Sequence, residues 1–295
     1  MMKDRFMDLR SKHFCFSSRT LEVSAFLFLF HHVAPAQTGS ELLDACSRGD
    51  VKVVGELLNK GASIESKDIN QSTPLHIASE SGHFKVVELL VQRKANLAAK
   101  TKEGRNVLHS AAIGGDADTV RFLIKKGVSM EERADFRWTP LAFAAAKGNG
   151  AAIKAFLELK AEPGVFDQLG RAPIHLAATS GKADAVEAFL KAGVSPNLQT
   201  QKGLTPLIFA VGSGQSPVVR VLIKGKANVN FRTASGDTAI GGAVNAGNVT
   251  MVRDLIAAGA KVNVTDSIGR PLLKVAQMIR NNDIVAMLKK AGAKE

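Results

Sequence analysis

The stretch from Asp167 to Asn197 reads DQLGRAPIHLAATSGKADAVEAFLKAGVSPN and decides the fold. It contains two short helical patterns, which Gly181 separates and Gly193 closes. Its opening, from Asp167 to Ala177, has the form D-x-x-G-x-A-P-I-H-x-A. One such motif occurs easily by chance, so the fold depends on whether it recurs at a fixed spacing.

The motif recurs every 33 residues through most of the chain. The best copy is Thr73-Pro74-Leu75-His76, from which steps of 33 residues lead to six later copies and one earlier copy. The alanine two places after the motif is present in all eight copies: Ala45, Ala78, Ala111, Ala144, Ala177, Ala210, Ala243 and Ala276. The sequence therefore predicts eight units in unbroken register.

The recurring motif and its period resemble the ankyrin repeat, whose units begin D-x-x-G-x-T-P-L-H-x-A. The resemblance covers about residues 40–295 and implies an all-α solenoid of stacked helix-turn-helix units joined by hairpin turns. The chain length alone suggests two ordinary domains, but an unbroken repeat predicts one elongated array instead. We expect units near residues 40–66, 67–99, 100–132, 133–165, 166–198, 199–231, 232–264 and 265–295.

Residue types within the units predict where the helices begin and end. Thr73, Thr139 and Thr205 can cap a first helix with their hydroxyls, and a proline follows each of them at the first helical position. Apolar residues at helical spacing predict one buried stripe for each second helix. Glycines are expected to close second helices in the left-handed conformation: Gly127, Gly193 and Gly259.

Residues 1–39 do not match the repeat. They contain an apolar run, Val23 to Phe30, which is too short to span a membrane, and then Ala34-Pro35-Ala36, which resembles a signal cleavage site. More than twenty residues, including three acids, precede the apolar run. We expect a disordered tail or a remnant of a larger upstream region, and a signal or transit peptide is the alternative.

The net charge is +12, from 39 basic and 27 acidic residues. Such an excess attracts acidic proteins, membrane surfaces or nucleic acid over a long range and does not choose among them. No run of five basic residues occurs, and the charges are dispersed among solvent-facing positions. This dispersal favours a solubilising surface over a nucleic-acid stripe, so nucleic acid is the least favoured partner.

Histidine and cysteine provide no catalytic or metal-binding pattern. The resemblance implies that His76, His109 and His175 bond backbone between units and that His83 is structural as well. His13, Cys15, His31 and His32 lack a fixed ligand spacing, so no metal site is predicted. Two cysteines cannot staple a chain of this size, so a cytoplasmic protein is expected, with the nucleus and an N-terminal signal left open.

Motifs for phosphate, dinucleotide, zinc-protease or serine-hydrolase chemistry are absent from the sequence. The glycines fall at repeat turns, and a stacked array has no obvious deep pocket in which to assemble a catalytic group. We therefore expect no enzymatic activity, no catalytic residues, no cofactor and no small-molecule substrate.

The positions at which the units differ are the candidates for partner recognition. The turn of unit four reads Ala134-Asp135-Phe136-Arg137-Trp138, with arginine in place of the usual glycine and the only tryptophan of the chain. Aromatic and arginine side chains often anchor interfaces. The alternative is that Phe136 and Trp138 pack on adjacent hairpins. The predicted partner-binding residues are Arg105, Phe136, Arg137, Trp138, Lys147, Leu169, Arg171, Lys202 and Leu204.

These observations predict a non-catalytic scaffold or adaptor. It would bind an acidic or partly apolar segment of another protein on the concave face and the hairpin tips. Two alternatives remain: a membrane-surface adaptor that uses the basic face and the apolar tail, and a nucleic-acid-associated regulator.

Overall fold

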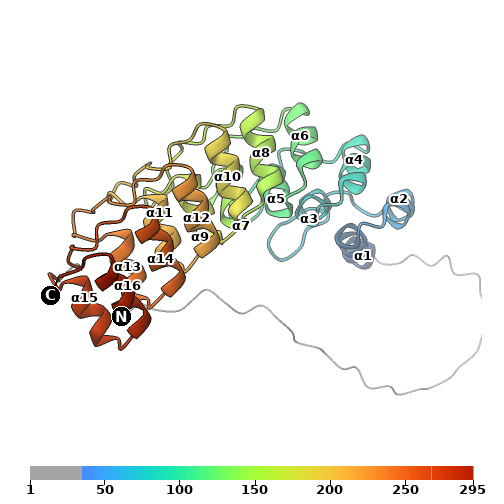
Figure 1. Cartoon of the computed structure of the whole chain (residues 1–295). Helices are drawn as coiled ribbons and strands as arrows, with labels where there is room; N and C mark the ends of the chain where they lie inside the picture. The colour runs from blue at the N-terminus through green and yellow to red at the C-terminus, as the bar shows by residue number, and fades with distance from the viewer. Residues whose placement is uncertain (1–34, 267, 295) are drawn as a thin grey trace, which may run out of the picture. The chain divides into compact units, whose positions relative to one another are not determined.

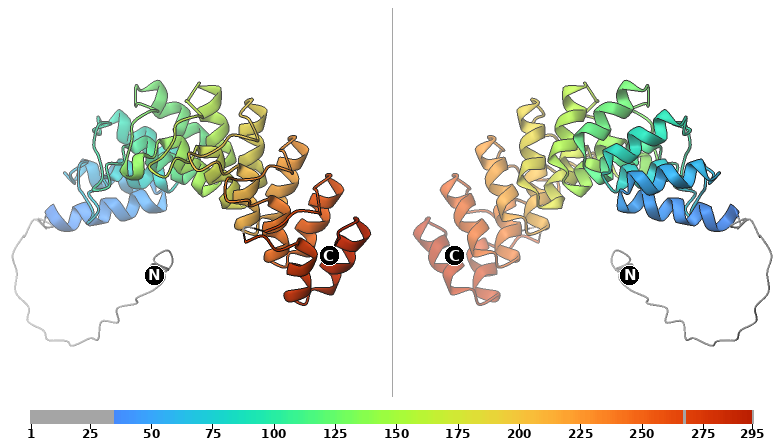
Figure 2. Two further views of the ribbon diagram at one scale, coloured as in Figure 1. Left: turned by 90° about the vertical axis from the view of Figure 1, so that its left-hand side faces the viewer. Right: turned by 90° about the vertical axis from the view of Figure 1, so that its right-hand side faces the viewer.

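The computed structural model describes residues 35–266 and 268–294, which belong to one compact unit. Over these residues the chain forms sixteen α-helices in eight pairs, and its only β-structure consists of two isolated bridges. The helix pairs follow one another in a single curved row (Figures 1 and 2). The all-α repeat prediction is confirmed. None of the described helices is long and apolar enough to cross a bilayer.

The helices alternate between two layers. The first helices of the units are α1 (Pro35–Arg48), α3 (Pro74–Glu80), α5 (Val107–Gly114), α7 (Pro140–Lys147), α9 (Pro173–Ser180), α11 (Pro206–Gly212), α13 (Ala239–Asn245) and α15 (Leu272–Met278). The second helices are α2 (Val51–Asn59), α4 (Phe84–Gln92), α6 (Ala117–Lys125), α8 (Gly150–Glu158), α10 (Ala183–Lys191), α12 (Ser216–Lys224), α14 (Val249–Ala257) and α16 (Asn282–Lys290). A short 3₁₀ turn, η1 (Asp135–Arg137), lies in the hairpin of unit four.

The first helices begin largely as the sequence predicts. In units four and six the hydroxyls of Thr139 and Thr205 accept hydrogen bonds from backbone N–H groups three residues later, for example from Ala142 at 3.3 Å. Thr73 differs, because its hydroxyl lies 2.9 Å from Nδ1 of His76 and not on a backbone donor. In units two, four, five and six, proline occupies the first helical position, where its missing N–H has no partner: Pro74, Pro140, Pro173 and Pro206.

The array begins earlier than predicted. Helix α1 starts at Pro35, so residues 35–39 of the predicted tail are helical. Gly39 is buried, and a Cβ atom there would lie 2.8 Å from Oγ of Ser66. The close approach of this turn to the first inter-unit loop explains why it joins the array. The predictions on residues 1–34, including the apolar run, lie outside the described residues.

The core lies between the two layers and between neighbouring units. The eight motif alanines are completely buried, which lets each first helix press against its counterparts in the adjacent units. Second helices fill the remaining space with larger side chains, among them Phe156 and Phe189. Burying a side chain of that size contributes roughly 1.5–3 kcal/mol, so stability comes from stacking and not from a single centre.

One left-handed residue follows each second helix. The predicted closures at Gly127, Gly193 and Gly259 are confirmed, with φ of 89°, 83° and 85°. Three other units place a lysine in the same conformation, which costs a residue with a side chain roughly 1–2 kcal/mol. Their φ angles are 64°, 69° and 64° for Lys94, Lys160 and Lys226.

Candidate partner-binding surface

The hairpin turns join into a continuous row. The backbone N–H of Lys102 donates to the carbonyl of Asn70 at 2.8 Å, and that of Asp135 donates to Glu103 at 3.0 Å. The next turn repeats this contact: the backbone N–H of Gln168 donates to the carbonyl of Phe136 at 3.0 Å. The tips of units two to five are therefore held at a fixed spacing.

Asp167 organises the turn of unit five. Its Oδ1 accepts hydrogen bonds from the backbone N–H groups of Leu169 at 2.9 Å and Arg171 at 2.8 Å. Burial acts to raise the pKa of this carboxyl, but the hydrogen bonds from Arg171 and Trp138 outweigh burial and hold the pKa below its usual range. Asp167 is thus an ionised part of the scaffold and not a free acid.

Trp138 is half-buried between two units. Its Nε1 donates to Oδ2 of Asp167 at 3.1 Å, and its ring meets Phe143 edge-on with centroids 5.1 Å apart. The guanidinium of Arg171 lies 5.9 Å from the ring centroid. These contacts tie the hairpin of unit four to that of unit five, as the packing alternative for Trp138 expects.

The arginines at the equivalent turn position are also engaged within the array. Nε and Nη2 of Arg171 each approach Oδ2 of Asp167 at 2.8 Å. Arg105 pairs with Glu80 at 3.7 Å and with Glu103 at 3.5 Å, and only 18% of its side chain is exposed. A partner would have to compete with these contacts, so partner binding by either arginine stays a prediction.

Phe136 and Leu169 form the most exposed apolar feature of the central units. They occupy the same place in consecutive turns and are 65% and 61% exposed. The backbone hydrogen bond from Gln168 to Phe136 holds their two turns together. We call these two residues the apolar tip pair.

The backbone at Phe136 is unusual for this array. Phe136 and Arg137 both have left-handed φ, 58° and 61°, whereas neighbouring turns have a single left-handed residue, such as Gly104 or Gly170. A residue with a side chain held there costs on the order of 1–3 kcal/mol. Strain of this kind often accompanies a functional position.

The remaining predicted residues lie in three kinds of place. Arg137 and Lys202 are exposed on the tips, and Lys202 occupies in unit six the place that Leu169 has in unit five. Leu204 is half-buried below that tip. Lys147 is exposed at the last residue of the eight-residue helix α7, about 12 Å along the helix from the hairpins. The structure therefore does not bring Lys147 to the tips.

A hollow in unit seven was missed by the sequence predictions. It has a volume of about 160 Å³, and it lies against the preceding unit as well, because its lining includes Ile208 of α11 beside Asp237, Gly241 and Gly242. Gly242 stands where units four and six carry phenylalanine, so the repeat register itself contains the signal. This position lies in helix α13 and not in the hairpin turns, where most of the predicted partner-binding residues lie.

The motif histidines link neighbouring units. Nε2 of His76 lies 3.3 Å from the carbonyl of Arg105, and Nε2 of His109 lies 3.2 Å from that of Trp138. A carbonyl only accepts, so Nε2 carries the proton in each ring. Burial lowers the pKa of both histidines to about 4, which keeps them neutral near pH 7. His175 makes the equivalent bond to the next unit, with its Nε2 3.2 Å from the carbonyl of Leu204, and a second bond within its own unit at 2.9 Å from the carbonyl of Leu198.

No group of three or more histidine, cysteine or acidic side chains that could hold a metal occurs among the described residues. His13, Cys15, His31 and His32 lie outside them. Cys46 is completely buried, and burial raises the pKa of its thiol to about 12. This cysteine is therefore a packed apolar group and not a nucleophile.

Comparisons with known proteins agree with the geometry. No curated protein matches the sequence. A family model for ankyrin repeats, in three copies, matches residues 42–134, 108–200 and 174–266. The matched segments overlap and together span well over half of the chain. The chain therefore belongs to the ankyrin repeat family.

Proposed function

We propose that the chain is a non-catalytic scaffold that binds another protein through the hairpin tips of units four to six. Ankyrin repeats are in general protein–protein interaction modules. The observation that carries the specific proposal is the apolar tip pair, Phe136 and Leu169, exposed side by side on turns that are bonded to each other.

The chemistry of the tips indicates the kind of partner. Covering one large apolar side chain contributes roughly 1.5–3 kcal/mol, so the apolar tip pair alone can anchor a partly apolar segment. Arg137 and Lys202, which are exposed on tips beside this pair, favour acidic residues in that segment and speed its encounter. The partner is therefore an acidic, partly apolar stretch of another protein.

The same proposal has no place for catalysis, a cofactor or a small-molecule substrate. Its support is that Trp138, Arg171 and the motif histidines all serve contacts between units. A cytoplasmic location also belongs to the proposal and rests on the sparse use of cysteine.

The test compares two double variants of the full chain. Phe136→Ser with Leu169→Ser removes the apolar tip pair, and the control, Ile69→Ser with Ile268→Ser, removes two hairpin residues that are 92% and 71% exposed. Immobilised proteins capture partners from extract, which are quantified by mass spectrometry. We expect partners of the wild type to be lost, at least tenfold, only by the first variant.

Equal loss in both variants, or none in either, would contradict the proposal once thermal melts confirm that both proteins fold. Substitutions at Trp138 or Arg171 are weaker tests because they break the contacts with Asp167 and loosen two hairpins together.

A further inference from the structure

The ends of the second helices lie along one edge of the array. These helices share one register and pack on their neighbours, so residues 33 apart in sequence become adjacent in space (Figure 2). We define the N-terminal edge as residues 59–66, 92–99, 125–132 and 158–165. The C-terminal edge is the corresponding set of residues 191–198, 224–231, 257–264 and 290–294.

The two edges differ in acidic residues and not in basic ones. The N-terminal edge has six basic residues, Lys60, Arg93, Lys94, Lys125, Lys126 and Lys160, and five acidic residues, Glu65, Glu131, Glu132, Glu158 and Glu162. Over its described residues the C-terminal edge has six basic residues and no acidic one: Lys191, Lys224, Lys226, Lys261, Lys290 and Lys294. Glu295, which follows in the sequence, lies outside the described residues. All six lysines are exposed. Among the described residues, Lys191 alone of the six forms a salt bridge, with Glu187 at 3.2 Å.

One source of this difference is the side chain that joins consecutive units, which we call the inter-unit clamp. In unit one Oε1 of Glu65 accepts from the backbone N–H of Asn96 at 2.7 Å. In unit five Oδ1 of Asn197 accepts the equivalent bond from Asn228 at 2.7 Å. Units six and seven use asparagine in the same way: Asn230 and Asn263. A neutral amide therefore makes the bond as well as a carboxylate does.

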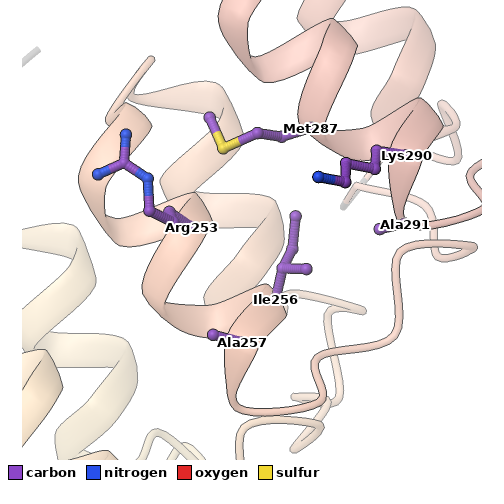
Figure 3. A pocket seen from close by; sticks show the side chains of 6 residues that line it. All are labelled: Arg253, Ile256, Ala257, Met287, Lys290 and Ala291. Atoms are coloured by element: carbon purple, nitrogen blue, oxygen red, sulfur yellow. The ribbon is translucent and has the colours of Figure 1, made fainter.

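The groove between α14 and α16 continues the same pattern. It encloses about 480 Å³, and Figure 3 shows Ile256 and Lys290 pointing into the space between the two helices. Arg253 and Met287 also line it. The C-terminal edge therefore adjoins a groove that combines basic side chains, Arg253 and Lys290, with apolar ones, Ile256 and Met287.

The corresponding groove three units earlier, between α8 and α10, has an acid in its wall. Glu158 occupies the place of Ala257 there and pairs with Arg121 at 2.9 Å and with Lys154 at 3.8 Å. Neither Arg253 nor Lys290 forms a salt bridge with another described residue. The same scaffold position is therefore neutralised in unit four and left basic in units seven and eight.

We propose that the C-terminal edge binds an anionic membrane surface. Neighbouring helices lie about 8–10 Å apart, close to the screening length in physiological salt, so the fields of these lysines add together. Clusters of four to eight basic residues are typical of proteins that recognise anionic lipid headgroups. This role is separate from the proposed protein binding, because it uses none of the tip residues.

The composition of the edge favours a lipid surface over nucleic acid. The six basic residues of the edge itself are all lysine, a point charge that suits a diffuse anionic surface. The adjoining groove adds one arginine, Arg253, whereas recognition of phosphates and bases typically uses several arginine forks. Stacking of bases needs exposed aromatic rings, and the only aromatic residue of the edge, Phe231, is half-buried. Duplex DNA and RNA remain as outcomes of the test.

The test measures binding of the full chain to vesicles of phosphatidylcholine, with and without 30% phosphatidylserine (roughly a cytoplasmic-leaflet charge density), by co-sedimentation. The variant Lys224→Gln/Lys261→Gln/Lys290→Gln is compared with Lys60→Gln/Lys94→Gln/Lys126→Gln, which has the same net charge. Each lysine near an anionic surface strengthens binding about fivefold, so the first variant should bind about a hundredfold more weakly. The second should change binding less than about fivefold, and only vesicles with phosphatidylserine should bind the wild type.

A single substitution provides an independent check. Asn197→Asp retains the acceptor of the inter-unit clamp and adds one negative charge to the edge. It should weaken vesicle binding about fivefold at an unchanged melting temperature. Equal weakening by both triple variants, no binding to anionic vesicles, or tighter retention on duplex DNA or RNA at the same ionic strength would each overturn the proposal. Loss of vesicle binding with intact capture of tip partners would leave the proposed protein binding unaffected.

Discussion

In units one and three the inter-unit clamp is a glutamate, whereas in units five to seven it is an asparagine. The bonds are alike: Oε1 of Glu131 accepts from a backbone N–H at 3.1 Å, and Oδ1 of Asn230 accepts at 2.8 Å. The stack therefore requires an acceptor at this place but no charge. The charge at this position can therefore vary without loss of the bond, and the two halves of the array differ in this surface charge.

The halves differ in buried histidine as well. Units two and three have His76 and His109 at the fourth motif position, and unit five has His175. Units six, seven and eight have Ile208, Gly241 and Lys274 there. In units two and three, the contacts with the next unit therefore include a histidine that can be protonated in mild acid. In the last three units, the residue at the same position cannot.

We expect the largest difference between the two halves at low pH, which should destabilise the N-terminal units more than the last three units. The pKa of His76 and His109 is about 4 in the folded array and near 6.5 when unfolded, so the unfolded state binds more protons between these values. The stability that depends on neutral His76 and His109 is present above pH 6.5 and is lost as the pH falls from 6.5 towards 4. Lowering the pH from 7 to 5 should remove roughly 2 kcal/mol per histidine.

Hydrogen exchange followed by mass spectrometry, corrected for the intrinsic effect of pH, would locate this loss. Peptides from α3 and α5 should lose protection before peptides from α13 and α15. Earlier loss in α13 and α15 would contradict the comparison. The variant His76→Gln/His109→Gln serves as the control, because it removes both titrating groups and should flatten the response.

The clamp itself should have a smaller effect. Asn230→Ala removes one bond in which Oδ1 accepts and another in which Nδ2 donates to the carbonyl of Gly259 at 3.0 Å. We expect a loss of about 1 kcal/mol, because both bonds are exposed. Glu131→Gln keeps an acceptor and should change stability by less than about 0.5 kcal/mol. Urea unfolding measures both, and a larger loss from Glu131→Gln would show that the charge itself supports the stack.

The smallest predicted effect is a gain in stability. Lys226→Gly removes the steric strain of a side chain in the left-handed conformation. Glycine also makes the unfolded chain more flexible, which offsets part of this gain, so the free energy of unfolding should rise by about 0.5 kcal/mol. The control is Lys224→Gly, which replaces the last helical residue of α12 and should lose up to about 1 kcal/mol. Thermal melts of the two variants in parallel measure the difference, and a loss of stability from Lys226→Gly would contradict this interpretation of the cap.

Most of the fold could be predicted from the sequence because each unit repeats its own signals. Proline at the first helical position, glycine after the second helix and the buried alanine recur in register, so one stretch predicts the others. The start of α1 at Pro35 could not be predicted in this way. Its additional turn depends on a close contact between Gly39 and Ser66, for which the repeat has no counterpart.

The candidate site could be predicted only in part. Sequence alone does not say whether a turn side chain points to solvent or to the next hairpin, and Trp138 turned out to bond Asp167 while Phe136 is exposed. The basic residues are dispersed along the sequence and form no run of five in it. Stacking brings residues 33 apart together, so Lys191, Lys224 and Lys290 lie on one edge in space.

The reach of the inter-unit clamps also bears on how the chain folds. Each clamp spans 31 residues and therefore connects only adjacent units, so no long loop has to close before a pair of units becomes stable. Folding can begin at any neighbouring pair and spread outward. In mild acid the last three units, whose joints lack the motif histidine, would be the seed on which the N-terminal units assemble in turn.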